Sequence, residues 1–328
     1  MKDKKRTAWI IGTGPSLRDI DISKLKNEHT MTFNRAYIAF EDWGFDPTYY
    51  LCIDANDLRS VYKDINNLIE NSGVKAFFLP EIKDNLAHPP ESFQDGDKKR
   101  NLFINHKKVF TMINYPTTEA ARATTNVASM YEKDTRIYPN KREIYTFHDS
   151  NGGIMGLKIL KALGYDEVAF VGCDARYKDD EESNKHITTM NNEYISNEDY
   201  DVNHFRDDYF GKGIRFGKPN EEWIIKLWWW ASHQLESASK ASDKYPGIRP
   251  IKVYSCTKNS NLNEYYPYIP FEDFLNGERQ PEVEINRKHM KIPSLEGHNV
   301  VSRVGRRPTG PAKIRDADKV FNRKDKSE

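Results

Sequence analysis

Cysteine is scarce in this sequence, and no apolar segment is long enough to cross a membrane. The three cysteines, Cys52, Cys173 and Cys256, each lie in or beside an apolar, strand-like run. An odd number at this spacing fits neither a zinc site nor a disulfide framework, so a reducing compartment is expected. The charged start of the chain is not followed by the apolar core of a signal peptide. We therefore expect a cytoplasmic protein without a membrane span, either cellular or made by a virus such as a phage inside its host.

Neither sign of charge is in excess. Fifty Lys and Arg residues stand against 49 Asp and Glu, a net charge of +1, so no global field favours a nucleic acid or a membrane surface. Basic residues instead gather at the end, where residues 301–328 hold nine Lys and Arg and four Asp and Glu. Because aromatic residues are nearly absent there, no specific nucleic-acid binding is expected. We predict a folded domain over residues 1–285 and a disordered or docking basic tail over residues 286–328.

Short apolar runs that end in glycine, proline or a polar residue recur along the chain. Predicted strands cover residues 7–12, 30–34, 47–54, 75–80 and 251–257, and predicted helix-containing segments cover 153–174 and 221–240. This alternation predicts an α/β fold, a mostly parallel sheet with helices on both faces. Residues 81–150 show no regular pattern. Residues 175–222 are polar and loop-like, which is typical of a lid or a substrate loop.

A glycine turn follows the first predicted strand. It consists of Gly12, Thr13, Gly14, Pro15 and Ser16. Glycine permits close backbone approach, and successive N–H groups can bind a phosphate. The turn lacks the Lys-Ser/Thr ending of a P-loop and the third glycine of the dinucleotide fingerprint. On this motif alone, an ordinary tight turn is an equal alternative.

Further glycines and polar residues stand at the other predicted strand ends and helix starts. They are Asn34, Asp54, Asn151, Gly152, Gly153 and Asp174. Each Asn or Asp taken singly also fits an ordinary turn. Because the carboxyl ends of parallel strands share one edge of a sheet, we expect these residues to surround one nucleotide-binding crevice.

Candidate catalytic residues lie in the polar segment after Asp174. Arg176, Tyr177 and Lys178 come first and supply donors suited to a phosphate, with a solvated loop as an equal alternative. His204 follows between aromatic and acidic residues, and histidine titrates near neutral pH, as a general base must. Taken alone, a histidine in such a segment is more often a surface residue.

Other residues in the sequence are weaker candidates. His148 is the next histidine, and Lys212 and Arg215 add positive charge near His204. Four tryptophans on the predicted helix over 221–240 fit core packing better than a sugar platform. Because three of them are consecutive (228–230), they cannot all face one way. At least one is expected to meet a second element or a partner, which leaves a homo-oligomer open.

The ordered set of motifs resembles a known family. GTGPSL, FNRAY, DPTYYLCIDAN, SNGGIMGLKILKALGYDEVAFVGCD, NHFRDDYFGKG and KVYSCTKNSNLNEYYPYIPFEDFL cover most of residues 7–275. Their order is that of the 6-hydroxymethylpterin diphosphokinase MptE-like family, or domain of unknown function 115, which includes motility accessory glycosyltransferases. It is also similar to the bacterial sialyltransferases of glycosyltransferase family 42.

The resemblance to sialyltransferases implies a Rossmann-like, variant GT-A fold that binds a CMP-activated sugar without an obligatory metal. By motif, His204 falls where the lid histidine is the general base, and Arg176 stands in place of a phosphate-contacting tyrosine, with Tyr177 next to it. Asp54 takes the place of a strand-end asparagine. The remaining implied nucleotide-site positions are Gly12, Gly14, Pro15, Ser16, Asn34, Asn151 and Gly152.

Three functions follow as hypotheses. The first is an inverting glycosyltransferase that needs no cofactor and transfers a sugar from a nucleotide sugar to an acceptor hydroxyl. The second is a pterin diphosphokinase that uses ATP and Mg²⁺, with Asp54, Asp57 and Asp174 as metal ligands. The third is a non-enzymatic nucleotide-binding or virion-associated assembly protein that uses the tryptophan helix and the basic tail.

Overall fold

The computed structural model describes residues 5–53, 55–80, 103–114, 135–146, 151–178, 184–190, 193–217, 221–242, 250–282 and residue 285. Several predictions concern residues outside these ranges, namely Asp54, His148 and the basic tail over 286–328. The side chains of Asp57 and Arg215 also lie outside the description.

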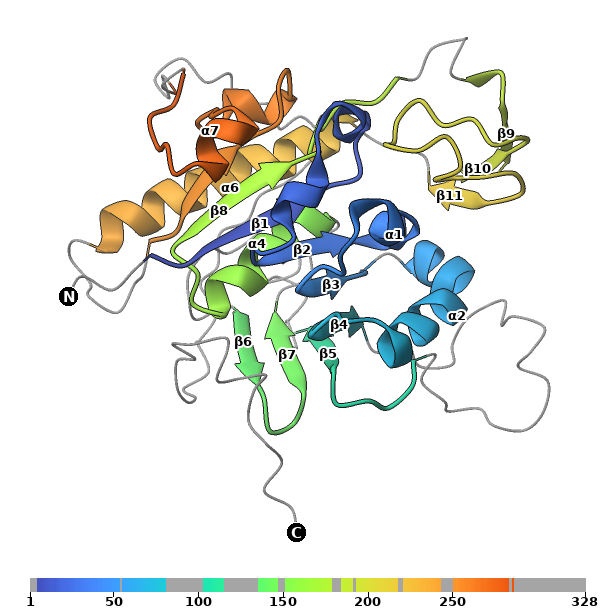
Figure 1. The fold of residues 1–328 in the computed structure, drawn as a ribbon, viewed down its shortest axis with the longest axis horizontal. Coiled ribbons are helices and arrows are strands. Elements are labelled where there is room, and N and C mark those ends of the chain that lie inside the picture. The colour runs from blue at the N-terminus through green and yellow to red at the C-terminus, as the bar shows by residue number, and fades with distance from the viewer. Residues whose placement is uncertain are drawn as a thin grey trace, which may run out of the picture.

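Nine strands form the main sheet in the described part of the chain, in the order β12-β8-β1-β2-β3-β4-β5-β7-β6 (Figure 1). The strands are β1 (Thr7–Ile11), β2 (Thr30–Phe33), β3 (Tyr49–Leu51), β4 (Ala76–Pro80), β5 (Val109–Asn114), β6 (Thr135–Tyr138), β7 (Glu143–Thr146), β8 (Glu167–Val171) and β12 (Lys252–Ser255). Every neighbouring pair is parallel except β6 and β7. The predicted mostly parallel α/β sheet is confirmed.

Helices cover both faces of this sheet. The α-helices are α1 (Phe40–Trp43), α2 (Ala55–Asn71), α4 (Gly152–Ala162), α6 (Glu221–Ser242) and α7 (Phe271–Leu275). Single 3-10 turns are η1 (Pro15–Asp19), η2 (Ile22–Leu25), η3 (Asn34–Ala39) and η5 (Asn261–Glu264). Among the described helices, none is both long and apolar enough to cross a membrane.

Strand β1 shows how the two hydrophobic layers arise. Ala8 and Ile10 belong to the cluster that includes α4 and α6, whereas Trp9 and Ile11 belong to the cluster with α1, α2 and α7. Because successive side chains of a strand point to opposite faces, a strand that is buried on both sides needs a continuous apolar run. The sequence of β1 has such a run, so β1 can be buried on both faces within this Rossmann-like sheet.

Helix α6 packs its tryptophans mainly against the main sheet and its neighbours. Trp228 is buried, with its ring 4.8 Å from that of Phe170 on β8 and 5.8 Å from that of Tyr266. Trp229 is also buried, and Trp230 packs partly buried against the same core. These tryptophans are core residues, as predicted.

The strand order reverses between β1 and β8. The chain runs outward from β1 through β2, β3, β4 and β5, and then returns through α4 to place β8 on the other side of β1. In an open α/β sheet, ligands bind outside the carboxyl ends of the strands at such a reversal. The glycine turn (residues 12–16) and the segment from Gly172 to Asp174 follow these two strands directly.

A second, three-stranded antiparallel sheet lies beside the main one (Figure 1). Its strands are β9 (Ile187–Met190), β10 (Glu193–Ser196) and β11 (Arg215–Gly217). The prediction of a loop-like segment with little to bury over residues 175–222 was therefore wrong, since Tyr194, Phe205 and Tyr209 are buried there. The strands are only three or four residues long and mix apolar with polar residues, so no apolar period marks them. No disulfide joins Cys52, Cys173 and Cys256, and all three are buried.

Candidate functional site

The glycine turn is joined to the end of β8 by its own backbone. The Gly12 N–H donates to the Val171 carbonyl at 2.7 Å, and the Gly14 N–H donates to the Gly172 carbonyl at 2.8 Å. A Cβ atom on Gly12 would lie 2.2 Å from the Gly172 oxygen. Close backbone approach therefore explains these glycines. It also engages two of the N–H groups that the sequence offered to a phosphate.

Two predicted nucleotide-binding residues contact each other across this junction. The Ser16 hydroxyl donates to Oδ2 of Asp174 at 2.8 Å. Burial raises the pKa of Asp174, and the hydrogen bonds from Ser16 oppose that rise only in part. A Cβ atom on Gly14 would lie 1.9 Å from the same Oδ2 atom, so the carboxyl group fills the space that the glycine leaves.

Asn34 and Gly152 lie at the same edge of the sheet. Asn34 begins η3 with φ at 53°, in the left-handed region, and its carbonyl accepts a bond from the Tyr50 hydroxyl at 2.5 Å. Its buried Oδ1 atom has no hydrogen-bond partner among the described residues. A Cβ atom on Gly152 would lie 3.2 Å from the ring of Phe33, the last residue of β2. The structure therefore brings the start of α4 to the end of β2.

The start of α4 is capped by a predicted site residue. The Asn151 side chain accepts a hydrogen bond from the Ile154 N–H at 3.1 Å, as an N-cap residue does. Gly153 lies against Trp228, because a Cβ atom on it would be 2.7 Å from that indole ring. Packing and capping thus account for part of the Asn-Gly-Gly sequence.

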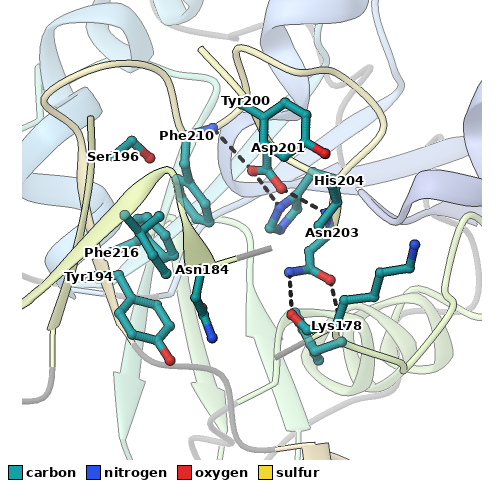
Figure 2. Close-up of a pocket in the computed structure, with 13 residues that line it drawn as sticks. Lys178, Asn184, Tyr194, Ser196, Tyr200, Asp201, Asn203, His204, Phe210 and Phe216 are labelled. Atoms are coloured by element: carbon teal, nitrogen blue, oxygen red, sulfur yellow. Dashed lines mark hydrogen bonds and ion pairs between the residues drawn. The ribbon is translucent and has the colours of Figure 1, made fainter. Parts of the chain in front are cut away.

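His204 forms a buried pair with Asp201 (Figure 2). Nδ1 of His204 lies 2.8 Å from Oδ2 of Asp201, and each residue is 8% exposed. The carboxylate also accepts bonds from the backbone N–H groups of Asn203 at 2.9 Å and Phe210 at 3.3 Å. The imidazole ring is stacked on Tyr209, with centroids 4.0 Å apart and planes 5° apart. The expectation of a surface histidine was therefore wrong.

This pair borders a small pocket of about 50 Å³ between the His204 segment and the second sheet. Its walls are aromatic and polar, as Figure 2 shows. They consist of Tyr177, Lys178, Asn184, Ile187, Tyr194, Ser196, Tyr200, Asp201, Val202, Asn203, His204, Phe210 and Phe216. Two residues from the strand-end segment after Asp174 thus meet His204 in one pocket.

Arg176 lies elsewhere. It lines a second, open groove with Lys258 and Tyr268, and its Nη2 atom donates to Oδ1 of Asn261 at 3.0 Å. The structure therefore brings Tyr177 to the pocket of His204 and turns the preceding residue away from it. Lys212 is exposed, and its backbone N–H donates to Asp199; it is not among the residues that line the pocket.

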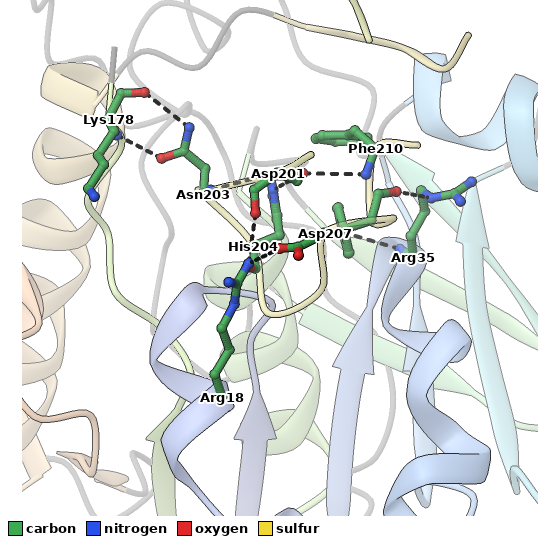
Figure 3. Close-up of polar contacts among 9 residues, drawn as sticks. Arg18, Arg35, Lys178, Asp201, Asn203, His204, Asp207 and Phe210 are labelled. Atoms are coloured by element: carbon green, nitrogen blue, oxygen red, sulfur yellow. Dashed lines mark hydrogen bonds and ion pairs between the residues drawn. The ribbon is translucent and has the colours of Figure 1, made fainter. Parts of the chain in front are cut away.

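Residues 201–210, the His204 loop, are fastened onto the glycine turn (Figure 3). The Phe205 N–H donates to the Thr13 carbonyl at 3.1 Å. Nη2 of Arg18 donates to the carbonyls of Asp201 at 2.8 Å and His204 at 2.9 Å. The histidine predicted as a base and the turn predicted to bind the nucleotide are therefore neighbours.

Asp201 and Arg18 were missed by the sequence analysis. Asp201 stands three positions before His204, and that spacing was the available signal. Arg18 carries no signal in the sequence, because its role depends on a contact between segments far apart in the chain. In the part of the chain that the structure describes, no three His, Cys, Asp or Glu residues gather as metal ligands would. Of the three carboxylates proposed for magnesium, only that of Asp174 is described.

Comparison with solved structures finds two glycosyltransferases. One is the Maf glycosyltransferase from Magnetospirillum magneticum AMB-1, at 14% identity and a TM-score of 0.40, with 85% of this chain and 35% of that chain covered. This chain thus spans about a third of that protein's length. The other is the sialyltransferase CstII from Campylobacter jejuni, in complex with the substrate analogue CMP-3FNeuAc. It has 16% identity and a TM-score of 0.37, with 89% of this chain and 97% of that chain covered.

At these identities the likeness concerns the fold alone. No protein-family model matches the chain. No curated protein matches it either. The resemblance to the MptE-like family therefore stays a prediction from the sequence.

Proposed function

We propose that this protein is an inverting glycosyltransferase that transfers a sugar from a nucleotide-sugar donor to an acceptor hydroxyl. One observation carries the proposal. A buried His204–Asp201 pair borders a pocket, and its loop is hydrogen-bonded to the glycine turn at the point where the strand order reverses. A general base and a nucleotide-binding edge are thereby brought together.

The Asp201 carboxylate sets the tautomer of His204. Because the carboxylate can only accept, Nδ1 carries the proton and donates it in this hydrogen bond, and Nε2 keeps the lone pair that a general base needs. Two backbone N–H groups hold the carboxylate, and the Tyr209 ring holds the plane of the imidazole. This base is therefore fixed in orientation before the acceptor arrives, which reduces the entropic cost of the reaction.

The chemical step is a displacement at the anomeric carbon. The acceptor oxygen attacks that carbon as Nε2 of His204 takes the hydroxyl proton, and the bond to the donor phosphate breaks. The nucleotide leaves with the electron pair of that bond. Tyr177, which lines the same pocket as His204, is proposed to stabilise the departing phosphate. Arg176 can share this role only if its side chain leaves the groove where Asn261 holds it.

The donor is proposed to lie along the carboxyl edge of the sheet. Thr13, Pro15 and Ser16 of the glycine turn, Asn34, and the start of α4 at Gly152 and Gly153 line that edge. Asn34 contributes a buried acceptor that has no partner among the described residues. The sequence resemblance to sialyltransferases favours a CMP-linked sugar. A histidine that acts as the general base needs no metal.

A thermal-shift screen tests the proposal. The full chain is heated with CMP, UDP, GDP and ATP, each with and without Mg²⁺, because a ligand that binds the folded state raises Tm by mass action. A rise with one nucleotide that does not need Mg²⁺, followed by hydrolysis of the corresponding nucleotide sugar, is the expected result. A rise only with ATP and Mg²⁺ would favour the diphosphokinase instead. Binding of no nucleotide would contradict both enzymes and favour the assembly protein.

A further inference from the structure

Arg18 occupies a position between the glycine turn and the His204 loop. It lies on η1 (Pro15–Asp19), which begins inside the glycine turn and shares Pro15 and Ser16 with it. Its side chain extends from there to the His204 loop, as Figure 3 shows. Any ligand that contacts Ser16 is therefore only two residues away from Arg18 along the chain.

The contacts of Arg18 concentrate on the backbone of the Asp201–His204 pair. Nη2 lies 2.8 Å from the Asp201 carbonyl, 2.9 Å from the His204 carbonyl and 2.8 Å from Oδ1 of Asp207. This nitrogen has two hydrogens, so the three oxygens share them. Two of the three acceptors are the backbone carbonyls of the residues that form the catalytic pair. The guanidinium thus holds the backbone at both ends of the Asp201–His204 turn.

A second arginine fastens the same loop without contacting the pair. Arg206 donates to the Ile38 carbonyl at 2.9 Å and to the carboxylates of Asp42 and Asp208. It has the same side chain as Arg18. It lies on the His204 loop itself and also joins that loop to the body of the domain. Arg206 therefore serves as a matched control for the loss of an anchoring arginine.

We propose that Arg18 is a positioning residue that holds the Asp201–His204 pair against the glycine turn and so fixes the orientation of the base. Its effect on turnover rests on the proposed function, whereas its effect on the loop does not. The backbone bond from Phe205 to Thr13 remains when the side chain of Arg18 is removed. The loop then stays attached, while the two carbonyls lose their common donor.

Hydrogen exchange measures how firmly Arg18 holds the loop, and it needs no substrate. Amide exchange of the full-length protein is followed by mass spectrometry in wild type, Arg18→Ala, Arg18→Lys and Arg206→Ala. We expect faster exchange over residues 201–205 in Arg18→Ala, partial recovery in Arg18→Lys, whose ammonium can still donate, and a smaller effect there in Arg206→Ala. Equal exchange in wild type and Arg18→Ala would overturn the proposal. If Arg18→Ala does not fold, the same comparison between wild type and Arg18→Lys decides, with faster exchange over residues 201–205 expected.

Turnover then separates positioning from simple anchoring. The probe is hydrolysis of a CMP-linked sialic acid by the full chain. Loss of orientation is expected to lower kcat by about 10²-fold in Arg18→Ala with little change in KM, and Arg18→Lys should regain part of it. A fall in kcat no larger than that of Arg206→Ala would overturn the coupling to catalysis. If wild type hydrolyses no nucleotide sugar, the proposed function fails, and the exchange experiment still decides whether Arg18 holds the loop.

Discussion

The carboxylate of Asp201 holds Nδ1 of His204 at 2.8 Å, and the two residues are buried together. Neither would be buried at low cost alone, because an unpaired polar group inside a protein loses its hydration. Here the carboxylate has the imidazole and two backbone N–H groups as donors. The first two predictions test the proposed role of this pair as the general base.

Removal of the imidazole should strongly lower turnover and leave nucleotide binding intact. General base catalysis contributes about 10²–10⁴-fold, so His204→Ala is expected to lose at least the lower part of that range in kcat. Nucleotide Kd, measured by calorimetry, should stay near that of wild type. His106→Ala is the control, since His106 precedes β5 in the chain and thus lies near the opposite edge of the sheet. Unchanged turnover in His204→Ala would remove this residue from the mechanism.

Asp201→Asn tests the tautomer rather than the presence of the base. The Asn203 N–H donates to Oδ1 of Asp201, whereas the Phe210 N–H and His204 Nδ1 share Oδ2. An amide oxygen in the Oδ1 position keeps the Asn203 bond and leaves the NH₂ toward His204 Nδ1, with loss of the 3.3 Å bond from Phe210. Nδ1 must then accept, and the proton moves to Nε2, where it blocks the base. In a Ser-His-Asp triad, the same change costs about 10⁴ in kcat. We expect a loss in kcat that approaches that of His204→Ala, with only a modest fall in the thermal unfolding temperature from the lost Phe210 bond. A variant with wild-type kcat would show that the Asp201 carboxylate has a structural role and does not set the tautomer of His204.

A methyl group at Gly12 should destabilise the fold. Its Cβ would lie 2.2 Å from the Gly172 carbonyl oxygen, a backbone atom that cannot rotate away, so β1 and β8 must separate locally. Overpacking of this kind costs about 1–3 kcal/mol in the free energy of unfolding, measured by urea titration. Gly217→Ala is the control, because nothing lies within 4 Å of a Cβ atom there. Equal free energies of unfolding for the two variants would contradict the close contact between Gly12 and Gly172.

Glu167 should make the fold sensitive to acid. It is 3% exposed and binds Lys5 and Arg279. Burial alone would raise the pKa of its carboxyl group, but the hydrogen bonds from Arg279 and Lys5 outweigh that and lower it below the ordinary 4.5. A lowered pKa contributes stability above the unfolded value, and that stability is lost as the pH falls through the folded value.

The measurement is the urea midpoint of wild type and Glu167→Gln as the pH is lowered from 7. Wild type should be more stable at pH 7, and the two curves should approach each other below the ordinary pKa of 4.5. Asp174 acts in the opposite direction because its pKa is raised. It is present in both proteins, so it cancels in the difference. Parallel curves at every pH would show that Glu167 contributes no proton-linked stability.

The strands around the site were predictable because each is buried on both faces. Residues 7–12 and 75–80 are near-continuous apolar runs, as parallel strands require. Residues 30–34 instead combine Met31 and Phe33 with two threonines that are also buried. Asn34, Gly12 and Asp174 were predicted at one edge because parallel strands have their carboxyl ends on the same side of the sheet. The glycines were found, but their cause is a close approach to Gly172 and Asp174.

The rest of the site depends on contacts that no local pattern encodes. Strands β9 and β11 are only four and three residues long, so their period is not visible in the sequence. The burial of His204 depends on Tyr209 and on Arg18, which is 186 positions away. Arg176 and Tyr177 are neighbours in the chain, yet they line different pockets. The residue before them, Ala175, has a φ of 49°, which non-glycine residues uncommonly adopt and the sequence does not indicate.

The insertion of β8 beside β1 also sets the order in which the protein can mature. Ribosomes finish β2 through β7 before residues 167–171 are made, so the nascent sheet keeps an open edge along β1. Exposed edges recruit other strands and promote aggregation. Polypeptides truncated ahead of β8 should therefore need chaperones to remain dispersed, and protease resistance should arise abruptly once that strand clears the exit tunnel.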